Sequence, residues 1–361
     1  MTHDARGAWP VPVDGVSVVL CTYDGARFVR EQLETVLGQT HPPLEVVVSD
    51  DGSTDDTLDV VRSVAAGTAT PVHVSRNRTT LGFADNFLQA STRARGRWIA
   101  FSDQDDRWAP EKLERSLDAL GTHGAVLATH PVRLVDEQGA PLPAGRRRRP
   151  RGTRVVPPGH ADPWGNHFGF TMLLERSLLE RIPSSERGLD DFTPGAPLAH
   201  DRWVHFLAST FGRTVLLAEP LADYRQHRSQ AYGRLPHRGI RARIRTKVEA
   251  GRDQALYLAG VAAHRAALLE DWAPAGDDGA WRAGARRWRA IESHCRRRAE
   301  LQGAGPVARR AGLLAGNVWH GVYRSTGRGG LGAERLVEDV VVSVLRGRAT
   351  REGYFASTSS E

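Results

Sequence analysis

Short apolar runs alternate with helically spaced segments over the first 120 residues of the chain. The apolar runs are predicted strands, and they cover residues 16–20, 44–48, 72–74 and 98–102. The segments between and after them carry apolar side chains three or four positions apart and are predicted helices, at residues 27–37, 53–64, 85–92 and 110–120. Strands that alternate with helices require right-handed crossovers. We therefore predict an α/β fold with a mostly parallel, Rossmann-like sheet and helices on both faces.

Three carboxylates follow the fourth predicted strand within four positions, at Asp103, Asp105 and Asp106. We call these three residues the acidic cluster. Carboxylates this close repel one another unless a cation compensates them. Oxygen ligands at the end of a strand suit Mg²⁺ or Mn²⁺ that carries substrate phosphates, which predicts a metal–diphosphate site. The alternative is an acidic turn that caps the helix after Pro110.

Polar residues also follow the first and second predicted strands. Thr22 and Tyr23 come after the first strand, and Asp50 and Asp51 come after the second. Ligands of open parallel sheets lie beyond the carboxyl ends of the strands, so we expect these residues to share a crevice with the acidic cluster. For Asp50 and Asp51 we predict a carboxylate that accepts a hydrogen bond from a nucleotide base. Helix capping is the alternative for both.

Length and cysteine content limit the class of protein. A chain of 361 residues with 40% hydrophobic residues has room for about two domains. Its two cysteines, Cys21 and Cys295, form no disulfide framework and fit a reducing compartment, so we expect a cytoplasmic location. Residues 1–14 lack the pattern of an export signal, and no run of about eighteen apolar residues predicts a membrane span.

Positive charge is concentrated towards the C-terminus. Residues 1–233 contain 26 Lys and Arg against 29 Asp and Glu, whereas residues 234–361 contain 23 against 13. The second segment is also rich in tryptophan and helically spaced, so we predict an N-terminal tail over 1–14, an α/β domain over 15–233 and a basic, mainly helical accessory region over 234–361. A basic region fits nucleic acid, an anionic membrane surface or a diphosphate-linked acceptor, and charge alone does not choose among them.

Several motifs of the α/β domain occur in a fixed order. They are VVLCTYDG at 18–25, EQL at 31–33, QT at 39–40, SDDGSTD at 49–55, GF at 82–83, NF at 86–87 and DQDDRW at 103–108. In order and spacing they resemble the inverting family 2 glycosyltransferases, which have the GT-A nucleotide-diphospho-sugar transferase fold. The resemblance extends over roughly residues 15–232, and within the family it is closest to the bacterial rhamnosyltransferase-like branch. Asp24 departs from the pattern, because the family usually has asparagine there.

The resemblance implies a catalytic domain that transfers a sugar, with rhamnose suggested by the branch, from a UDP- or dTDP-linked donor to a hydroxyl acceptor. It also implies Mg²⁺ or Mn²⁺ as cofactor and a role in cell-surface polysaccharide or glycolipid synthesis. The acceptor would be a glycan or a lipid-linked molecule. The positive charge and the tryptophans of the C-terminal region separately suggest a peripheral contact with the inner face of the membrane. The alternative is that this region packs on the catalytic domain. No nucleic acid partner is expected.

The same resemblance implies roles for single residues. Asp51 would bind the pyrimidine base, and Asp106 would be the main metal ligand. His227, in the YRQH sequence at 224–227, would be a further metal ligand or a phosphate donor. The residues implied in binding the donor are Thr22, Tyr23, Asp50, Asp51, Asn86, Asp103 and Asp105.

Transfer to a hydroxyl requires a general base, because the hydroxyl is a poor nucleophile until its proton is being removed. Asp201 precedes an apolar helical segment and occupies the position that the resemblance implies for this base. The alternative is a helix-capping carboxylate. Residues 164–173 combine aromatic, amide and glycine residues, which predicts a wall for the acceptor or the donor sugar. An internal strand with close glycine packing is the alternative for that segment.

Two other functions remain open at this stage. A nucleotidyltransferase has a similar sheet and paired carboxylates, but it is expected to carry a glycine-rich phosphate loop with a basic residue, and residues 22–25 are not such a loop. The other alternative is a protein that binds nucleotide sugars or nucleic acid without catalysis.

Overall fold

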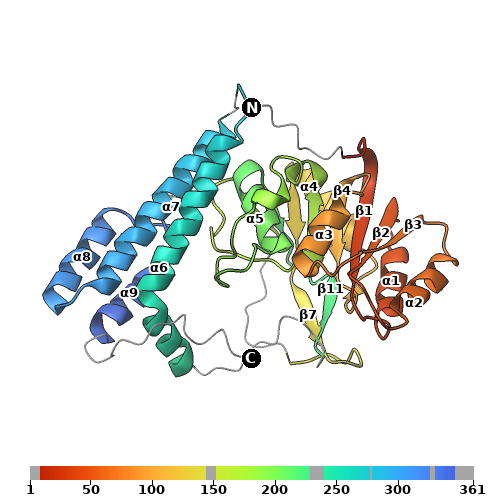
Figure 1. Ribbon diagram of the computed structural model, residues 1–361, viewed down its shortest axis with the longest axis horizontal. Coiled ribbons are helices and arrows are strands. Elements are labelled where there is room, and N and C mark those ends of the chain that lie inside the picture. Colours follow the sequence, from red (N-terminus) through yellow and green to blue (C-terminus); the bar gives the residue numbers. More distant parts are fainter. Residues whose placement is uncertain (1–8, 144–151, 228–239, 277–278, 326–329, 346–361) are drawn as a thin grey trace. The chain divides into compact units, whose positions relative to one another are not determined.

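The computed structural model describes residues 9–143, 152–227, 240–276, 279–325 and 330–345 (Figure 1). By its contacts the chain divides into two compact units. The α/β unit comprises Met1–Pro158, Gly165–Arg187 and Leu198–Arg234. The helical unit comprises Gly159–Trp164, Gly188–Pro197 and Leu235–Glu361. Two short segments that precede residue 233 in sequence thus belong to the helical unit.

The α/β unit contains an eight-stranded sheet with the order β3-β2-β1-β4-β9-β6-β10-β8. Its strands are β1 (Val13–Thr22), β2 (Glu45–Asp50), β3 (Val72–Arg76), β4 (Gly96–Ser102), β6 (Leu127–Thr129), β8 (Arg154–Val156), β9 (Leu173–Glu175) and β10 (Thr214–Leu216). The pairs β1–β2, β1–β4, β2–β3 and β6–β10 are parallel, whereas β8 and β9 pair antiparallel with their neighbours. The prediction of a mostly parallel sheet is confirmed.

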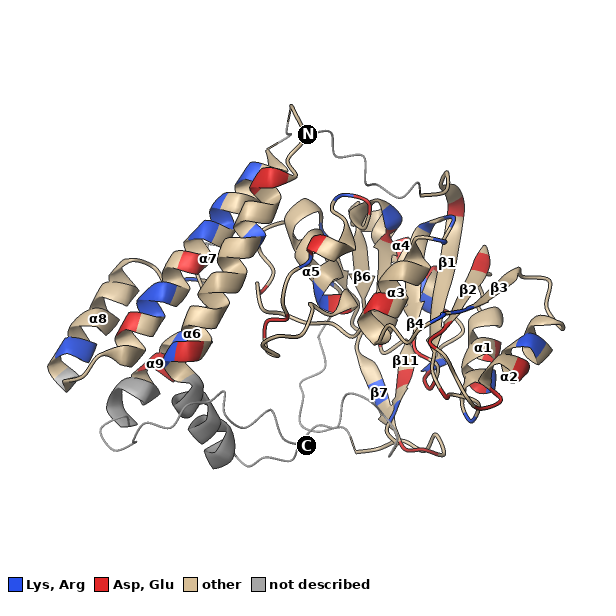
Figure 2. Cartoon of the chain, in the orientation of Figure 1, with Lys and Arg blue, Asp and Glu red and all other residues tan. Residues whose placement is uncertain are grey.

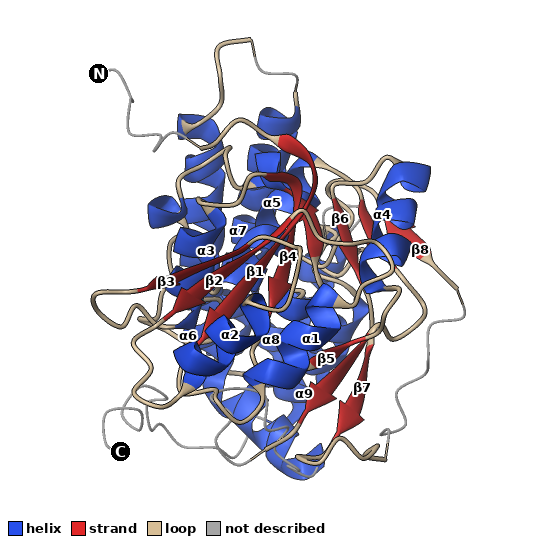
Figure 3. Cartoon of the chain, turned by 90° about the vertical axis from the view of Figure 1, so that its right-hand side faces the viewer, coloured by secondary structure: helices blue, strands red, loops and turns tan. Residues whose placement is uncertain are grey.

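Helices cover both faces of this sheet, which explains why residues 16–22 of β1 are all buried. Figure 3 shows α1 and α2 on one face and α3 and α5 on the other. The apolar residues Val29, Leu33 and Val36 lie three or four positions apart on α1 and are fully buried in the core. The helices of this unit are α1 (Val29–Leu37), α2 (Thr57–Ala65), α3 (Phe83–Ser91), α4 (Lys112–His123) and α5 (His200–Phe211).

A second, three-stranded sheet was not predicted from the sequence. Its order is β5-β11-β7, with β5 at Arg107–Trp108, β11 at Ala222–Arg225 and β7 at Val132–Val135. Because β5 follows β4 directly in the chain, residues 103–106 form the connection between the large sheet and the small one. The acidic cluster therefore lies at the junction of two sheets.

The helical unit contains α6 (Ile240–Asp271), α7 (Ala280–Gly303), α8 (Val307–Trp319) and α9 (Ala333–Leu345), which confirms that the C-terminal region is helical. Arginines recur along α7 (Figure 2). Within this unit Arg298 of α7 donates two hydrogen bonds of 2.8 Å to the fully buried carboxylate of Asp339 in α9. Among the described residues, no helix is both long enough and apolar enough to cross a membrane.

Candidate functional site

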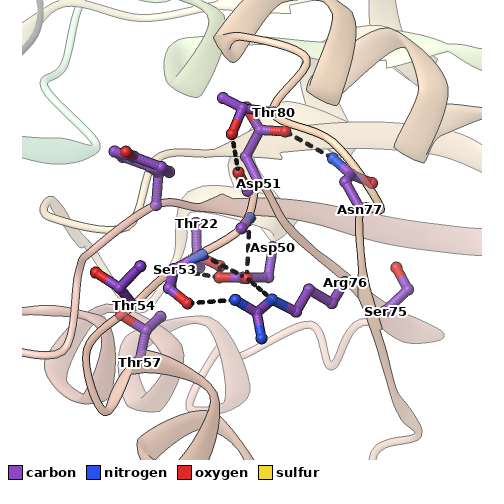
Figure 4. A network of polar contacts seen from close by, with 12 residues as sticks. Thr22, Asp50, Asp51, Ser53, Thr54, Thr57, Ser75, Arg76, Asn77 and Thr80 are labelled. Atoms are coloured by element: carbon purple, nitrogen blue, oxygen red, sulfur yellow. Dashed lines mark hydrogen bonds and ion pairs between the residues drawn. The ribbon is translucent and has the colours of Figure 1, made fainter.

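Asp50 organises the turn that follows β2. It is fully buried, and its carboxylate accepts hydrogen bonds of 2.9 Å from the hydroxyl of Thr22 and from the N–H of Ser53. The hydroxyl of Ser53 also donates to it, and Nε of Arg76 lies 3.8 Å away (Figure 4). These contacts engage both oxygens, so Asp50 and Thr22 hold the turn, and their contact with a donor remains a prediction.

Asp51 holds the loop that leads from β3 to α3. One carboxylate oxygen accepts from the side-chain amide of Asn77 and from the N–H of Leu81, both at 2.8 Å, and the other accepts from the N–H of Gly82 at 2.8 Å. The amide of Asn77 also donates to Asn86 at 3.0 Å. Asn86 is buried, and its side-chain amide donates to a main-chain oxygen of β2. Asn86 therefore holds Asn77, which in turn holds Asp51.

Gln104 ties the acidic cluster to the end of β1. Its side chain accepts from the N–H of Tyr23 and donates to the oxygen of Tyr23, both at 2.9 Å. A Cβ atom on Gly25 would lie 2.0 Å from Oε1 of Gln104, so the contact requires glycine at that position. The ring of Tyr23 is 52% exposed and available to stack on a ligand. Sequence reasoning missed Gln104, whose only signal is its place between two aspartates.

Asp24 keeps the turn although it departs from the family pattern. Its φ of +45° is in the left-handed region, which aspartate tolerates better than most residues. Its carboxylate accepts from the N–H of Thr54 at 2.7 Å. An asparagine oxygen at this position would accept the same bond.

Asp106 has one engaged and one unengaged carboxylate oxygen. Its Oδ1 accepts from the N–H of Arg225 at 3.2 Å, whereas its buried Oδ2 has no hydrogen-bond partner among the described residues. Burial, followed by the negative charges of Asp105 and Asp103, raises the pKa of Asp106 well above its usual value. A buried carboxylate with a vacant oxygen is the feature expected of a cation ligand.

Asp103, a member of the acidic cluster, lies within electrostatic reach of both Asp105 and Asp201. Burial raises its pKa to about 7, and the charges of Asp105 and Asp201 contribute to this rise. Burial raises the pKa of Cys21 as well, with further contributions from Asp103 and Asp51. The charges at the ends of β1, β2 and β4 and at the start of α5 therefore influence one another, and a crevice shared by these ends remains a prediction.

The acidic cluster fits a divalent cation. Among the described residues, no group of three or more His, Cys, Asp and Glu side chains is already gathered to hold a metal ion. One or two carboxylates suffice for Mg²⁺ or Mn²⁺, since phosphate oxygens and waters complete the coordination. Asp106, whose Oδ2 has no hydrogen-bond partner among the described residues, would supply one of them.

His227 lies beside the cluster. Its Nε2 is 2.7 Å from Oδ2 of Asp105, and its ring packs on Phe28 with 4.8 Å between centroids. A histidine bonded to a carboxylate in this way commonly orients that carboxylate near a metal. The roles of His227 as a metal ligand and of Asp105 in donor binding remain predictions.

Arg225 holds residues 103–106, the connection between the two sheets that contains the acidic cluster. It is 3% exposed, and its guanidinium donates to the main-chain oxygens of Asp105 and Glu137, both at 2.9 Å, and to Glu31 at 2.6 Å. All of its nitrogens are thus engaged within the protein. Arg225 therefore supports the cluster structurally, a role that the sequence pattern did not reveal.

Asp201 lies in the first turn of α5, and its neighbour His200 points into the core. The His200 ring stacks on Phe87 with 4.3 Å between centroids, and neither ring nitrogen has a hydrogen-bond partner among the described residues. Burial lowers the pKa of His200 to about 3, so it is neutral at physiological pH. The structure therefore gives His200 a packing role and leaves Asp201 as the candidate base.

Two other histidines, His205 and His167, lie near Asp201. His205 follows it by one helical turn on α5, and the rings of His205 and His167 lie 5.6 Å apart. Burial and the nearby His205 lower the pKa of His167 to about 4, whereas the charge of Asp201 opposes this shift. Residues around position 167 and the start of α5 thus lie together.

The predicted sugar wall forms an aromatic group. Phe168 is 41% exposed and packs against Phe170 and Tyr224, with centroid distances of 5.6 and 5.1 Å. A Cβ on Gly169 would lie 2.2 Å from Nε2 of His200, so glycine is needed for the segment to pack on α5. An exposed aromatic face suits the C–H surface of a sugar. Contact with a sugar remains a prediction.

Comparison with known proteins shows what part of the chain is similar to a known family. Residues 17–181 match the family model for glycosyl transferase family 2. An uncharacterized protein of Mycobacterium tuberculosis is 28% identical over 218 residues, which are 59% of this chain and 59% of that protein. An uncharacterized glycosyltransferase of Nostoc sp. is 26% identical over 224 residues, or 59% of this chain and 65% of that protein. The chain thus spans about three fifths of the length of these relatives.

Solved structures extend the comparison to the fold. The structure of residues 1–349 of S. aureus TarS in complex with UDP-GlcNAc has a TM-score of 0.54 and 16% sequence identity. It covers 91% of this chain and 89% of that one. Together with the mostly parallel sheet and the C-terminal helices, this likeness confirms the predicted GT-A fold. Residues 17–181 are thus similar in sequence to glycosyl transferase family 2, and the fold of the chain is that of a GT-A protein.

Proposed function

We propose that this protein is a metal-dependent, inverting glycosyltransferase. It moves a sugar from a UDP- or dTDP-linked donor to a hydroxyl of a glycan or lipid-linked acceptor in cell-surface polysaccharide or glycolipid synthesis. The observation that carries the proposal is the buried, unpartnered Oδ2 of Asp106 in a family 2 domain, with Asp201 in electrostatic reach of the same cluster.

The donor half of the site comprises the ends of β1, β2 and β4. Asp106 would be the main ligand of a divalent ion, with Asp103 beside it. The exposed side chain of Tyr23 would stack on the nucleoside, and Asp51 would contact its base. A bound Mg²⁺ or Mn²⁺ supplies charge neutralisation for the departing nucleoside diphosphate. The complex of S. aureus TarS with UDP-GlcNAc supports a nucleotide-sugar donor for this fold.

The acceptor half of the site is centred on Asp201. The acceptor oxygen bonds to the anomeric carbon while the bond from that carbon to the diphosphate oxygen breaks, and Asp201 takes the proton of the acceptor hydroxyl. A single displacement with one base inverts the configuration at the anomeric carbon. The exposed face of Phe168 binds the C–H surface of a sugar.

A lipid-linked acceptor is supported by the surface of the helical unit. Trp319 at the end of α8 is 84% exposed, and Val337 on α9 is 63% exposed. Residues 234–361 carry ten more basic than acidic side chains. Exposed apolar side chains in a region rich in basic residues favour binding to an anionic membrane surface.

Flotation with phosphatidylglycerol vesicles tests this contact. Trp319→Ser is expected to reduce binding, and undiminished binding would contradict it.

The main experiment measures nucleotide release from a panel of UDP- and dTDP-sugars, including dTDP-rhamnose and UDP-GlcNAc, with Mg²⁺, Mn²⁺ or EDTA. We expect metal-dependent release of UDP or dTDP from at least one donor. If no donor is turned over and none raises the melting temperature, the proposed function is wrong.

Two variants separate the halves of the site. Asp106→Asn is expected to lose metal-dependent binding of the nucleotide, whereas Asp201→Asn keeps that binding and loses turnover about 1,000-fold. Asp59→Asn is the control, because Asp59 lies on α2 with its side chain 79% exposed. Equal loss of nucleotide affinity in the Asp106 and Asp201 variants would contradict this division of roles.

A further inference from the structure

Residues 188–197 form a closed loop that belongs to the helical unit. The N–H of Asp190 donates to the oxygen of Ala196 at 2.9 Å, and Leu189 and Pro197 form an isolated antiparallel bridge. The carboxylate of Asp190 accepts from the N–H groups of residues 192 and 193, both at 2.9 Å. The loop therefore has a defined conformation of its own.

Two side chains of α6 hold this loop. Arg265 donates to the carboxylate of Asp191 at 2.6 Å, and the side chains of the pair are only 3% and 2% exposed. Two turns earlier on α6, the hydroxyl of Tyr257 donates to the main-chain oxygen of Asp190 at 2.6 Å. A buried ion pair of this kind fixes geometry, because separating its charges leaves one of them buried without compensation.

Arg265 also contacts the second segment that the helical unit takes from the middle of the chain. Its guanidinium lies 4.7 Å from the ring centroid of Trp288 on α7 and 5.6 Å from that of Trp164. Trp164 and Trp288 pack edge to face with 5.5 Å between centroids. The segment Gly159–Trp164 is thus anchored at the same point as the loop.

Both anchored segments lead directly into the acceptor half of the proposed site. Trp164 precedes His167 by three residues, and the loop ends at Pro197, four residues before Asp201. Within the α/β unit Arg187 closes the base of the loop, since its Nε donates to the oxygen of Leu198 at 2.7 Å. The donor half is formed by the ends of β1, β2 and β4. In the part of the chain that the structure describes, the segments that follow these ends stay in the α/β unit.

From this connectivity we propose that Arg265 is a positioning residue for the acceptor half of the site. By pinning the loop 188–197 and Trp164 in the helical unit, it sets the entry of the chain into α5 and hence the place of Asp201. The proposal rests on the proposed function only for the role of Asp201. Donor binding is independent of Arg265.

The test compares Arg265→Met with Arg298→Met. Arg298 is a matched control, because it forms a similarly buried ion pair with Asp339 inside the helical unit, 7% and 0% exposed, but holds no segment that leads to the site. Hydrogen–deuterium exchange of peptides from residues 198–211 is measured in the full chain, together with the binding of UDP and Mn²⁺ by calorimetry. We expect faster exchange in the Arg265 variant alone and unchanged UDP binding in both variants.

Nucleotide release gives the second readout. For Arg265→Met we expect kcat to fall about 100-fold with the KM for the donor nearly unchanged, since a displacement of about 1 Å at a reacting group has effects of that size. Arg265→Lys restores part of the rate, because it keeps the charge. Arg298→Met leaves kcat within about twofold of the unaltered protein, although it lowers the melting temperature.

Three results would overturn the proposal. The first is unaltered exchange of residues 198–211 in Arg265→Met, the second is equal acceleration in Arg298→Met, and the third is a loss of UDP affinity that matches the loss of turnover. If Arg265→Met does not fold, Tyr257→Phe replaces it, because this change removes only the hydrogen bond to Asp190. If no donor is turned over, the proposed function fails, but the exchange data still decide whether Arg265 positions α5.

Discussion

The ammonium nitrogen of Lys112 lies 3.2 Å from the centroid of the Trp108 ring. Lys112 is 1% exposed and donates a hydrogen bond of 2.6 Å to the main-chain oxygen of Phe170. Burial lowers the pKa of Lys112 well below its usual value, whereas the charges of Asp106 and Asp103 oppose this shift. The ring face and the two carboxylates favour the charged form of a side chain that is rarely buried alone.

Removal of this charge is expected to tighten metal binding. In Lys112→Met the acidic cluster loses a buried cation, which changes the electrostatic free energy by about 1 kcal/mol and lowers the dissociation constant for Mn²⁺ about fivefold. Electron paramagnetic resonance of free Mn²⁺ at about pH 8 measures this. Arg115→Met is the control, because Arg115 is exposed on the same helix and paired with Glu219. Unchanged or weaker Mn²⁺ binding in the Lys112 variant contradicts the prediction.

Asp103 is expected to make the metal-free protein less stable as pH rises. Its pKa is about 7 in the folded protein and about 4 when unfolded, so the folded state binds the extra proton between these values. Stability relative to Asp103→Asn is therefore greatest below pH 4 and falls by about 3 kcal/mol between pH 5 and 8. Urea unfolding of both proteins in EDTA gives this difference. A difference that is constant or grows with pH would refute it.

His200 is expected to weaken the protein in acid. Burial lowers its pKa to about 3, whereas the unfolded chain binds the proton near pH 6.5. The unfolded state thus binds more protons between these values, and the stabilisation present above pH 6.5 is lost as pH falls towards 3. His200→Leu removes one such proton and flattens the dependence of unfolding free energy on pH between 4 and 6.5. The exposed His41→Leu serves as control, and an equal slope in all three proteins would contradict the prediction.

Asp50 is expected to contribute more to stability than to chemistry. In Asp50→Asn an amide donor replaces a carboxylate oxygen that accepts hydrogen bonds from Thr22 and Ser53. These buried donors then lack an acceptor, which is expected to lower the free energy of unfolding by about 2–4 kcal/mol. Chemical denaturation measures this loss, with the exposed Asp59→Asn as control. In the fraction of Asp50→Asn that stays folded, we expect only a small loss of nucleotide affinity, because the change loosens the turn but removes no contact with the nucleotide. A fully stable Asp50→Asn that binds no nucleotide would instead make Asp50 a direct ligand.

The half of the large sheet formed by β1, β2, β3 and β4 was predictable because these strands carry strong local patterns. Residues 16–20 and 98–102 are apolar, and each helix between strands has a clear stripe, so element type follows from periodicity. Strands β6, β8, β9 and β10 have only three residues each, too few for a period to be read. The small sheet was not predictable, since β5 has two residues and no period can be read from two positions. Its pairing depends on β11, which lies more than a hundred residues further along the chain.

The sequence predicts which segments form the candidate site, but it does not distinguish the contacts of single residues within them. Asp50 and Asp51 are adjacent and chemically identical in the sequence, yet Asp50 is enclosed by its own turn and Asp51 by the loop after β3. Only tertiary contacts distinguish them. Lys112 and Arg225 read as ordinary charged residues, and their burial beside the acidic cluster is a property of the folded chain.

The segments Gly159–Trp164 and Gly188–Pro197 have a practical consequence for handling this protein. A stop codon placed after residue 233 would yield a fragment in which Asp191 and Trp164 face water instead of the side chains that enclose them. Such a fragment is expected to aggregate on expression, although its family 2 segment is intact. The helical unit should therefore be kept with the α/β unit when the protein is produced for biochemistry.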